Sequence, residues 1–322
     1  MLMRELVGDR YIHLEDNECF DFIWHYLDSW ADGQVQQNLL LHLPPGHFRT
    51  TLALTMALHL AGRYAGRRIA YLVADREAVS ALIDLTERLL SLRRMRFIFP
   101  RLSYQRKSRR FLFLEGGTLD FHVFGSPFNA EDVDTIILDE PQKPDNARVD
   151  WKAAAAQQYV RQNLLSTRRK KQILLINSLM SMNDIAVAFG VEHSSVQVHK
   201  GPMRYEESLQ LVWQSVTTRP ITYSMPRKTW DCPEYHILCE ELCPFSDQID
   251  ILRQVGSVEF ISRYLQMPLG KPDPYLPELP AQVLRNLTIA QTLEFVFQMR
   301  PQSPKIYEVI HDYFEKYPSA EI

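Results

Sequence analysis

Two acidic residues at the end of an apolar segment are the first candidates for chemistry in this 322-residue chain. The segment 133–138, VDTIIL, has the length and apolar character of a buried strand, and Asp139 and Glu140 follow it directly. Well upstream, a second apolar segment, 38–43, leads into PPGHFRTT at 44–51. A proline and glycine turn between a strand and a helix, followed later by a strand that ends in acids, is the layout of a phosphate-binding loop ATPase.

This layout assigns a role to each type of residue. Backbone amides at the loop and at the helix start bind phosphates, and a basic side chain reaches the terminal phosphates. A threonine hydroxyl and an aspartate hold Mg²⁺, while a glutamate polarises the attacking water. We therefore expect ATP as substrate, Mg²⁺ as cofactor, Glu140 and Arg49 as catalytic residues, Asp139 and Thr50 as metal ligands, and phosphate binding by Pro45, Gly46, His47, Phe48, Arg49, Thr50 and Thr51.

The loop differs from the consensus G-x-x-x-x-G-K-[ST] at two positions. Phe48 stands where the second glycine is expected, and a side chain resists the positive φ that glycine allows. Arg49 stands in the place of lysine and carries a wider, planar head group. An ordinary strand-to-helix turn at 44–51 is the alternative, and acids at a strand end are common in proteins without this activity.

The elements that must position these residues follow from hydrophobic periodicity. Strands alternate with helices, which indicates an α/β fold of the P-loop NTPase type with a mainly parallel sheet covered by helices. We expect a P-loop ATPase core over 1–190, a smaller lid or closing subdomain over 191–270, and a proline-rich linker with a helical tail over 271–322. The predicted helices are 19–30, 50–64, 77–92 and 151–165, and the predicted strands are 38–43, 68–73, 110–114, 118–124, 133–138 and 172–176.

Composition excludes several classes of protein. Hydrophobic residues make up 46% and charged residues 23% of the chain, which is typical of a folded globular protein and not of a disordered or fibrous one. No apolar run is long enough for a membrane helix, and four cysteines indicate a reducing, cytosol-like compartment. The formal charge of −3 neither requires nor excludes a nucleic acid partner.

Over about residues 11–270 the chain resembles the large terminase subunit of tailed bacteriophages. The stretch 32–54 is similar to that family's proline-led Walker A loop, and 133–143, VDTIILDEPQK, is similar to its Walker B segment. The stretch 173–189 resembles the coupling segment, with Asn177, Ser178 and Asp184 as its candidate residues. The stretch 242–270 resembles the end of the motor domain, through Phe260, Tyr264, Gln266 and Pro268.

The resemblance implies an ATP-driven motor that translocates double-stranded viral DNA into a procapsid, in the host cytoplasm. It implies a portal protein and a small terminase subunit as partners, and a homo-oligomeric ring on the portal. The family's nuclease domain needs several carboxylates for two metal ions, and the 52 residues after Gly270 are too few for such a domain, so we expect any nuclease on a separate chain. The alternatives are a degenerate relative that binds DNA or portal without hydrolysing ATP, and a helicase-like host ATPase.

Several residues outside the loop and the acidic pair are further candidates. His13 lies where the family binds adenine, although a surface histidine at a helix entry fits equally. Arg168 or Arg169 is expected to supply the missing cation as an arginine finger, and an arginine from the next subunit is the alternative. A basic run interleaved with aromatic residues is a candidate for contact with DNA phosphates or a solvated face, through Arg93, Arg94, Arg106 and Lys107.

Overall fold

The computed structural model describes residues 18–34, 37–147, 149–181, 183–191, 203–204, 207–212, 221–225, 228–232, 247, 250–251, 254–255, 257–264 and 266. His13 and the predicted tail over 271–322 lie outside these residues, as does much of the predicted subdomain over 191–270. The predicted role of His13 and the predicted domain boundaries stay predictions.

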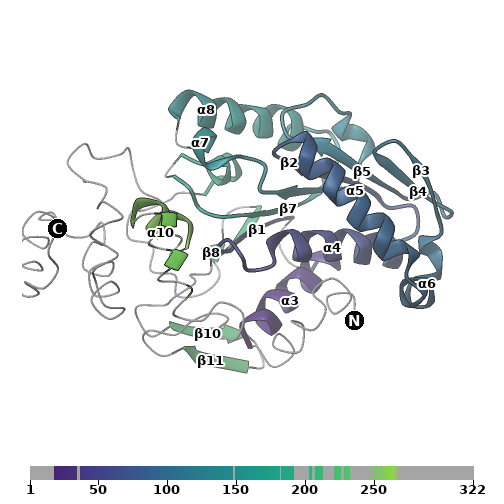
Figure 1. Ribbon diagram of the computed structural model, residues 1–322, viewed down its shortest axis with the longest axis horizontal. Helices are drawn as coiled ribbons and strands as arrows, with labels where there is room; N and C mark the ends of the chain where they lie inside the picture. Colours follow the sequence, from purple (N-terminus) through teal and green to yellow (C-terminus); the bar gives the residue numbers. More distant parts are fainter. Residues whose placement is uncertain are drawn as a thin grey trace, which may run out of the picture.

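The core consists of strands alternating with helices (Figure 1). In chain order, its first half contains α3 (Glu18–Ala31), β1 (Asn38–His42), α4 (Arg49–Arg63), β2 (Arg68–Val73), α5 (Arg76–Ser91), α6 (Arg93–Ile98), the short turn η2 (Pro100–Leu102), β3 (Tyr104–Lys107) and β4 (Arg110–Phe113). Its second half contains β5 (Thr118–Val123), η3 (Ala130–Asp132), β6 (Thr135–Asp139), α7 (Pro144–Ala147), α8 (Asp150–Tyr159), η4 (Val160–Leu165), β7 (Gln172–Asn177), η5 (Ile185–Phe189), β8 (Met203–Arg204) and β9 (Ser208–Val212). A separate hairpin, β10 (Ile221–Met225) with β11 (Lys228–Cys232), and the helix α10 (Ser257–Arg263) follow.

Within the described residues, nine strands form one mixed sheet in the order β3-β4-β5-β2-β6-β7-β1-β9-β8. The central strands β5, β2, β6, β7, β1 and β9 are parallel, whereas β3, β4 and β8 pair antiparallel at the two edges. The expected α/β fold with a mostly parallel, helix-flanked sheet is therefore confirmed at this level.

Alternating residues of each central strand fill two apolar cores, one on each face of the sheet. On β1, Leu39 and Leu41 pack with α3, α4 and α5, while Leu40 packs on the opposite face with η4 and η5. All three side chains are fully buried. Because both faces are covered, the strands read in the sequence as continuous apolar runs without polar alternation.

The sequence and the structure differ in three places. The expected helix over 151–165 is divided into α8 and a π-helical turn, η4, so the hydrogen-bonding pattern changes near Val160. Strand β3 was not expected, because its residues are largely exposed and its apolar content is low. Short strands were expected after residue 190 as part of a smaller subdomain, whereas β9 is buried along its length and extends the parallel part of the core sheet beyond β1.

The carboxyl ends of β1, β2, β6 and β7 lie at one edge of the sheet, in register with each other. The register pairs His42 of β1 with Asn177 of β7, and Asp139 of β6 with both Val73 of β2 and Ile176 of β7. Ligands in open α/β sheets bind outside the carboxyl ends of the strands. None of the helices in the described part of the chain is long and apolar enough to cross a membrane.

Candidate functional site

The turn between β1 and α4 contains a non-glycine residue with a positive φ, a conformation that side chains disfavour. Gly46 has φ 79° and Phe48 has φ 58°, so the aromatic residue adopts the left-handed conformation expected of the glycine it replaces. Such a conformation costs a non-glycine residue about 1 kcal/mol or more. Phe48 packs against the apolar core between the sheet and α4, and this contact offsets the strain. The first backbone N–H groups of a helix lack intrahelical partners, and no side chain caps those of α4.

Arg49 points into the protein and binds the acid at the end of β6. Its Nη1 lies 2.6 Å from Oε1 of Glu140, and it also donates to the Ser178 hydroxyl and, at 3.5 Å, to the Leu43 carbonyl. The side chain is only 8% exposed, and burial lowers the pKa of its guanidinium. The structure therefore brings Arg49, Glu140 and Ser178 together. These residues belong to three separate sequence motifs, and the motifs alone do not indicate that the three side chains are in contact.

Glu140 occupies a strained position at the exit of β6. Its φ is 42°, and its backbone N–H donates to the carbonyl of Ile176 at 2.9 Å, which fixes the turn against β7. Its side chain is 33% exposed and lies within 4.0 Å of an Nη of Arg263 on α10. A strained residue held by two neighbouring elements is typical of a functional site.

Asp139 is a buried carboxylate with one oxygen held and the other open. Oδ2 accepts a hydrogen bond from the Tyr71 hydroxyl at 2.8 Å, whereas Oδ1 accepts none from any described residue. Burial raises the pKa of Asp139 from 3.8 to about 6, and the Tyr71 hydroxyl and the nearby Thr50 hydroxyl act in the opposite direction.

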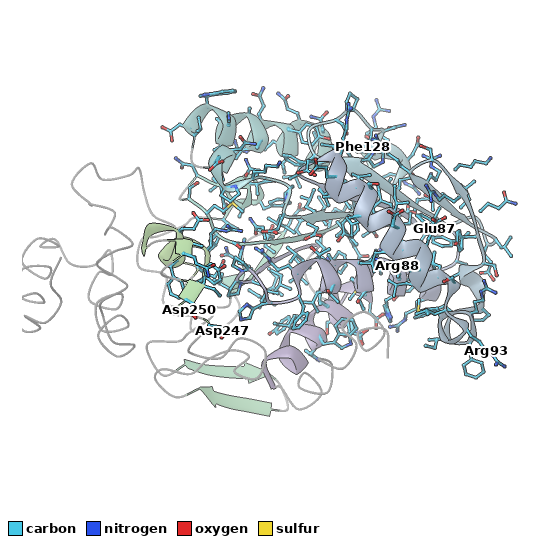
Figure 2. The ribbon with its side chains drawn as sticks, in the orientation of Figure 1. Glu87, Arg88, Arg93, Phe128, Asp247 and Asp250 are labelled. Carbon is cyan, nitrogen blue, oxygen red and sulfur yellow. The ribbon has the colours of Figure 1, made fainter. Side chains whose placement is uncertain are left out.

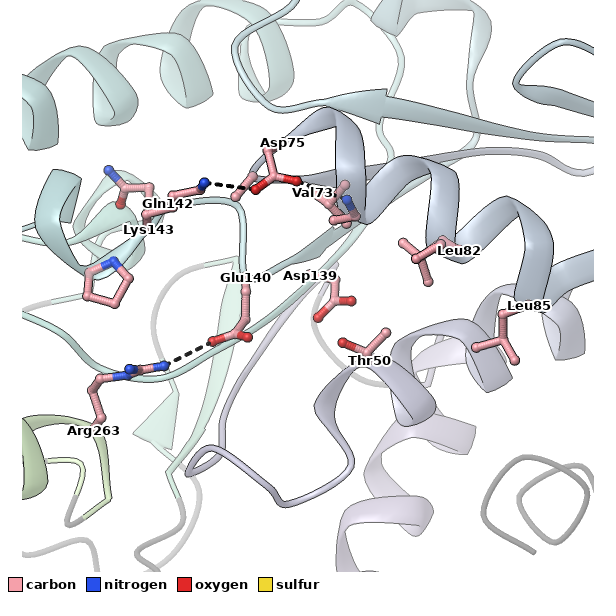
Figure 3. Close-up of a pocket in the computed structure, with 14 residues that line it drawn as sticks. Thr50, Val73, Asp75, Leu82, Leu85, Asp139, Glu140, Gln142, Lys143 and Arg263 are labelled. Carbon is pink, nitrogen blue, oxygen red and sulfur yellow. Dashed lines mark hydrogen bonds and ion pairs between the residues drawn. The ribbon is translucent and has the colours of Figure 1, made fainter. Parts of the chain in front are cut away.

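The open oxygen of Asp139 and the Thr50 hydroxyl face each other across a short gap (Figure 3). Two such oxygens fit Mg²⁺, because this ion prefers oxygen ligands and keeps several waters and phosphate oxygens as its other ligands. Within the described residues no group of three or more histidines, cysteines or acids could hold a metal by itself. Thr50 and Asp139 would supply two ligands to such an ion, and water or phosphate oxygens would supply the others.

A cavity of about 390 Å³ opens above these oxygens. Its floor is formed by Thr50, Asp139 and Glu140, and Arg263 lies across from them (Figure 3). One wall is the apolar face of α5, with Ala78, Ala81, Leu82 and Leu85, together with Val73 at the end of β2. The size and the mixture of an apolar wall with a few convergent polar groups match a small-molecule site.

A polar rim closes the cavity between α5 and the turn after β6. Lys143 Nζ lies 2.9 Å from Oδ2 of Asp75 (Figure 3). Asp75 also caps α5 by accepting from the backbone N–H of Ala78 at 2.9 Å. Lys143 and these hydrogen bonds hold the pKa of Asp75 below its usual range, and the same pairing raises the pKa of Lys143.

The turn after β7 joins the loop to α10. The backbone N–H of Leu43 donates to the Asn177 carbonyl at 3.0 Å, and Gln266 accepts from the N–H of Leu179 at 2.8 Å. Asp184 is buried and caps η5 by accepting from the N–H of Ala186. Asn177 and Ser178 thus contact the loop directly, while Asp184 lies farther along the same turn and has a structural contact of its own.

Other predicted residues lie apart from the cavity or turn away from it. His47 is buried, bonds through Nδ1 to the Pro45 carbonyl at 3.0 Å and has its pKa lowered by burial to about 4. Of the threonines, Thr50 lines the cavity and Thr51 does not. Arg168 and Arg169 contact Glu131 and Asp134 before β6, at the opposite edge of the sheet from Glu140. They do not reach this chain's own site, and a role in a neighbouring subunit stays a prediction.

The basic run lies at the far end of the molecule from α10. Arg93 begins α6, and Figure 2 places it at the opposite end from Asp250. Arg106 on β3 pairs with Glu87 of α5 at 2.5 Å, and Lys107 is exposed beside it. The backbone of Arg94 belongs to α6, and its side chain lies outside the described atoms. This run is separate from the cavity, and its predicted contact with DNA is untested.

Three cavity residues and one partner of Asp139 are not evident from the sequence. The partner is Tyr71, which sits inside an apolar strand, where a tyrosine is usually a core residue. Asp75 lies two residues after β2 and has no second acid beside it. Lys143 belongs to the Walker B likeness, which gives it no role of its own. Arg263 lies inside the motif 260–268, and its position between the matched aromatic residues was the available signal.

Comparison of the chain with protein-family models, with curated proteins and with solved structures finds no match.

Proposed function

We propose that this protein is an ATPase that drives double-stranded viral DNA into a procapsid, as the motor subunit of a terminase. The observation that carries the ATPase part is the open oxygen of buried Asp139, which faces the Thr50 hydroxyl at the uncapped start of α4 with Glu140 alongside. The motor part rests on the resemblance of four ordered segments to terminase large subunits.

The helix start supplies the phosphate contacts. Unpaired backbone N–H groups at the first turn of a long helix, with the positive end of its dipole, attract phosphate oxygens. The 15-residue helix α4 provides such a turn at Arg49, Thr50 and Thr51. When bound, Mg²⁺ would neutralise phosphate charge there, held by Thr50 and Asp139.

Glu140, next to Asp139, is the residue that we propose to orient the attacking water. Glu140 lines the cavity beside Asp139, and a third of its side chain is accessible. Hydrolysis requires its carboxylate to accept a hydrogen bond from the attacking water. The Arg49 guanidinium already engages that carboxylate at 2.6 Å, so this pair must separate before Glu140 can orient a water.

Phosphate offers Arg49 an alternative partner of the same charge as Glu140. Guanidinium groups bind phosphate oxygens with paired hydrogen bonds, and these bonds are among the strongest in proteins. Arg49 begins α4, so its backbone already lies where phosphates would bind. We infer that a bound triphosphate competes with Glu140 for Arg49, which would release Glu140 only when the substrate is present.

The decisive experiment measures Mg²⁺-dependent ATP hydrolysis by the full chain, with and without double-stranded DNA and portal. We expect turnover that DNA or portal stimulates, and its loss in Glu140→Gln with nucleotide binding retained. Glu115→Gln is the matched control, because Glu115 is exposed in the hairpin turn before β5. Turnover that persists in Glu140→Gln would contradict the assignment.

A second function is favoured by the same Arg49 contact. Arg49 and Glu140 form an ion pair in which Arg49 is buried, and Arg49 is also held by Ser178 and Leu43. If phosphate does not displace this pair, the protein binds DNA or portal without hydrolysing ATP. Absence of both nucleotide binding and turnover, with portal or DNA binding intact, supports this alternative.

A further inference from the structure

The cation that the sequence assigns to the phosphates does not line the cavity. Arg49 is buried and paired with Glu140, and it is not among the residues that line the cavity. Among the described residues, the basic side chains that do line the cavity are Lys143 and Arg263. A triphosphate in this cavity would therefore meet one of these two cations first.

Lys143 is held at the rim of the cavity by Asp75. Its ammonium group lies 2.9 Å from Asp75, and Asp75 is itself fixed as the cap of α5. The pair lies at the rim between α5 and the turn after β6, away from Thr50 and Asp139 in Figure 3. Moving Lys143 to a phosphate would break this pair and uncover the cap.

Arg263 has donors to spare and points toward Glu140, beside Asp139 (Figure 3). One Nη bonds to Glu259 at 2.8 Å, the other lies 4.0 Å from Glu140, and its buried Nε has no hydrogen-bond partner among the described residues. A guanidinium has five N–H donors in a fixed plane, so these contacts leave capacity for a further acceptor.

The turn at the end of α10 is anchored firmly enough to aim this side chain. Phe260 and Tyr264 stack with ring centroids 5.2 Å apart, and both are buried. Gln266 accepts from the N–H of Leu179 and donates to the Arg263 carbonyl, which ties the end of α10 to the turn after β7. Figure 3 shows the Arg263 side chain extending from this turn toward Glu140.

We propose that Arg263 binds the terminal phosphate of the nucleotide from the α10 side of the cavity, in the same chain that supplies Thr50 and Asp139. The proposal rests on the ATPase function proposed above and identifies a residue that distinguishes a triphosphate from a diphosphate. The terminal phosphate then replaces the long contact between Arg263 and Glu140.

The test compares the affinities of fluorescently labelled ATP and ADP, with Mg²⁺, for the full chain and its variants. Arg263→Gln removes the charge and keeps most of the side-chain length. We expect its ATP affinity to fall about ten- to hundredfold, the range for one charge-assisted hydrogen-bonding group, while ADP affinity stays within about twofold. Arg263→Lys should recover part of the loss, because lysine keeps the charge without the planar fork.

Glu259→Gln is the matched control on the same helix, because it removes the negative charge that pairs with Arg263 and keeps the guanidinium itself. Its ATP affinity should equal or exceed that of the unmodified chain. Equal weakening of ATP and ADP in Arg263→Gln, or no weakening of either, would overturn the proposal. Failure of the unmodified chain to bind either nucleotide would instead overturn the proposed ATPase function. Melting temperatures without nucleotide separate lost contacts from lost folding.

Discussion

Replacing Asp139 with asparagine should make the metal-free protein more stable at neutral pH. Burial raises the pKa of Asp139 from 3.8 to about 6, so the folded state holds its charged form at a disadvantage. A difference of about two pKa units corresponds to about 3 kcal/mol. Asparagine is nearly the same size, carries no charge, and its carbonyl can still accept from the Tyr71 hydroxyl.

The sign of the effect depends on pH. A carboxyl whose pKa is higher in the folded than in the unfolded state binds protons more tightly when folded, so its destabilising effect is absent below about pH 4 and complete above about pH 6. The free energy of unfolding of Asp139→Asn should therefore exceed that of the unmodified chain by up to about 3 kcal/mol at pH 7.5 and match it near pH 4.

Urea denaturation followed by tryptophan fluorescence, at pH 7.5 and pH 4 with EDTA, measures this difference. Asp84→Asn is the matched control, since Asp84 is exposed on α5. A destabilised Asp139→Asn at pH 7.5 would refute the claim that burial disfavours the charged form of this carboxyl.

Mg²⁺ with ATP, in place of EDTA, should reverse the order of stability of the two proteins. These ligands should stabilise the unmodified chain and leave Asp139→Asn unchanged.

Three further changes test other contacts. Tyr71→Phe removes the hydrogen bond to Asp139 and should lower the free energy of unfolding by about 1–3 kcal/mol at pH 7.5, measured with urea, and an unchanged value would contradict the 2.8 Å contact. His47→Gln should flatten the loss of stability between pH 6.5 and pH 4 by up to about 3 kcal/mol, because the folded state keeps the buried histidine neutral while the unfolded chain takes up a proton; an equal slope in both proteins would refute this. Gly62→Ala places a Cβ 2.3 Å from Cδ1 of Phe99 and should cost about 1–3 kcal/mol in thermal and urea unfolding, whereas a neutral result would disprove the close packing.

The central strands were predictable because both faces of each are buried. The runs at 38–43, 68–73, 133–138 and 172–176 are apolar throughout, and each forms a parallel strand of the sheet. The edge strand β3 was not predictable on this basis, since only one of its residues is even partly buried. Strand β9 carries polar residues that are nevertheless buried, such as Gln210, so its pattern does not read as a core strand.

The site was predictable in part. The positions of Asp139 and Thr50 at a strand end and a helix start follow from local pattern, and the structure brings both to one cavity. The direction of Arg49 could not be predicted, because it depends on Glu140 and Ser178 from two other strands. Arg263 was hidden for the same reason, since α10 reaches the cavity only through tertiary packing. Sequence patterns report spacing along one segment, whereas these contacts link four segments: the start of α4, the ends of β6 and β7, and α10.

Helix α4 begins at the cavity, and its other end contacts Phe99 directly after α6, where the basic run begins. It runs 15 residues without a break, from Arg49 to Arg63, about 22 Å at the usual rise per residue. Near its far end, Gly62 admits the ring of Phe99 against the backbone, and His59 meets the same ring edge-on. A continuous helix packed in this way moves as a rigid body. A displacement of its first turn along the helix axis would therefore change the contact with Phe99, next to α6, even if no strand of the sheet moves.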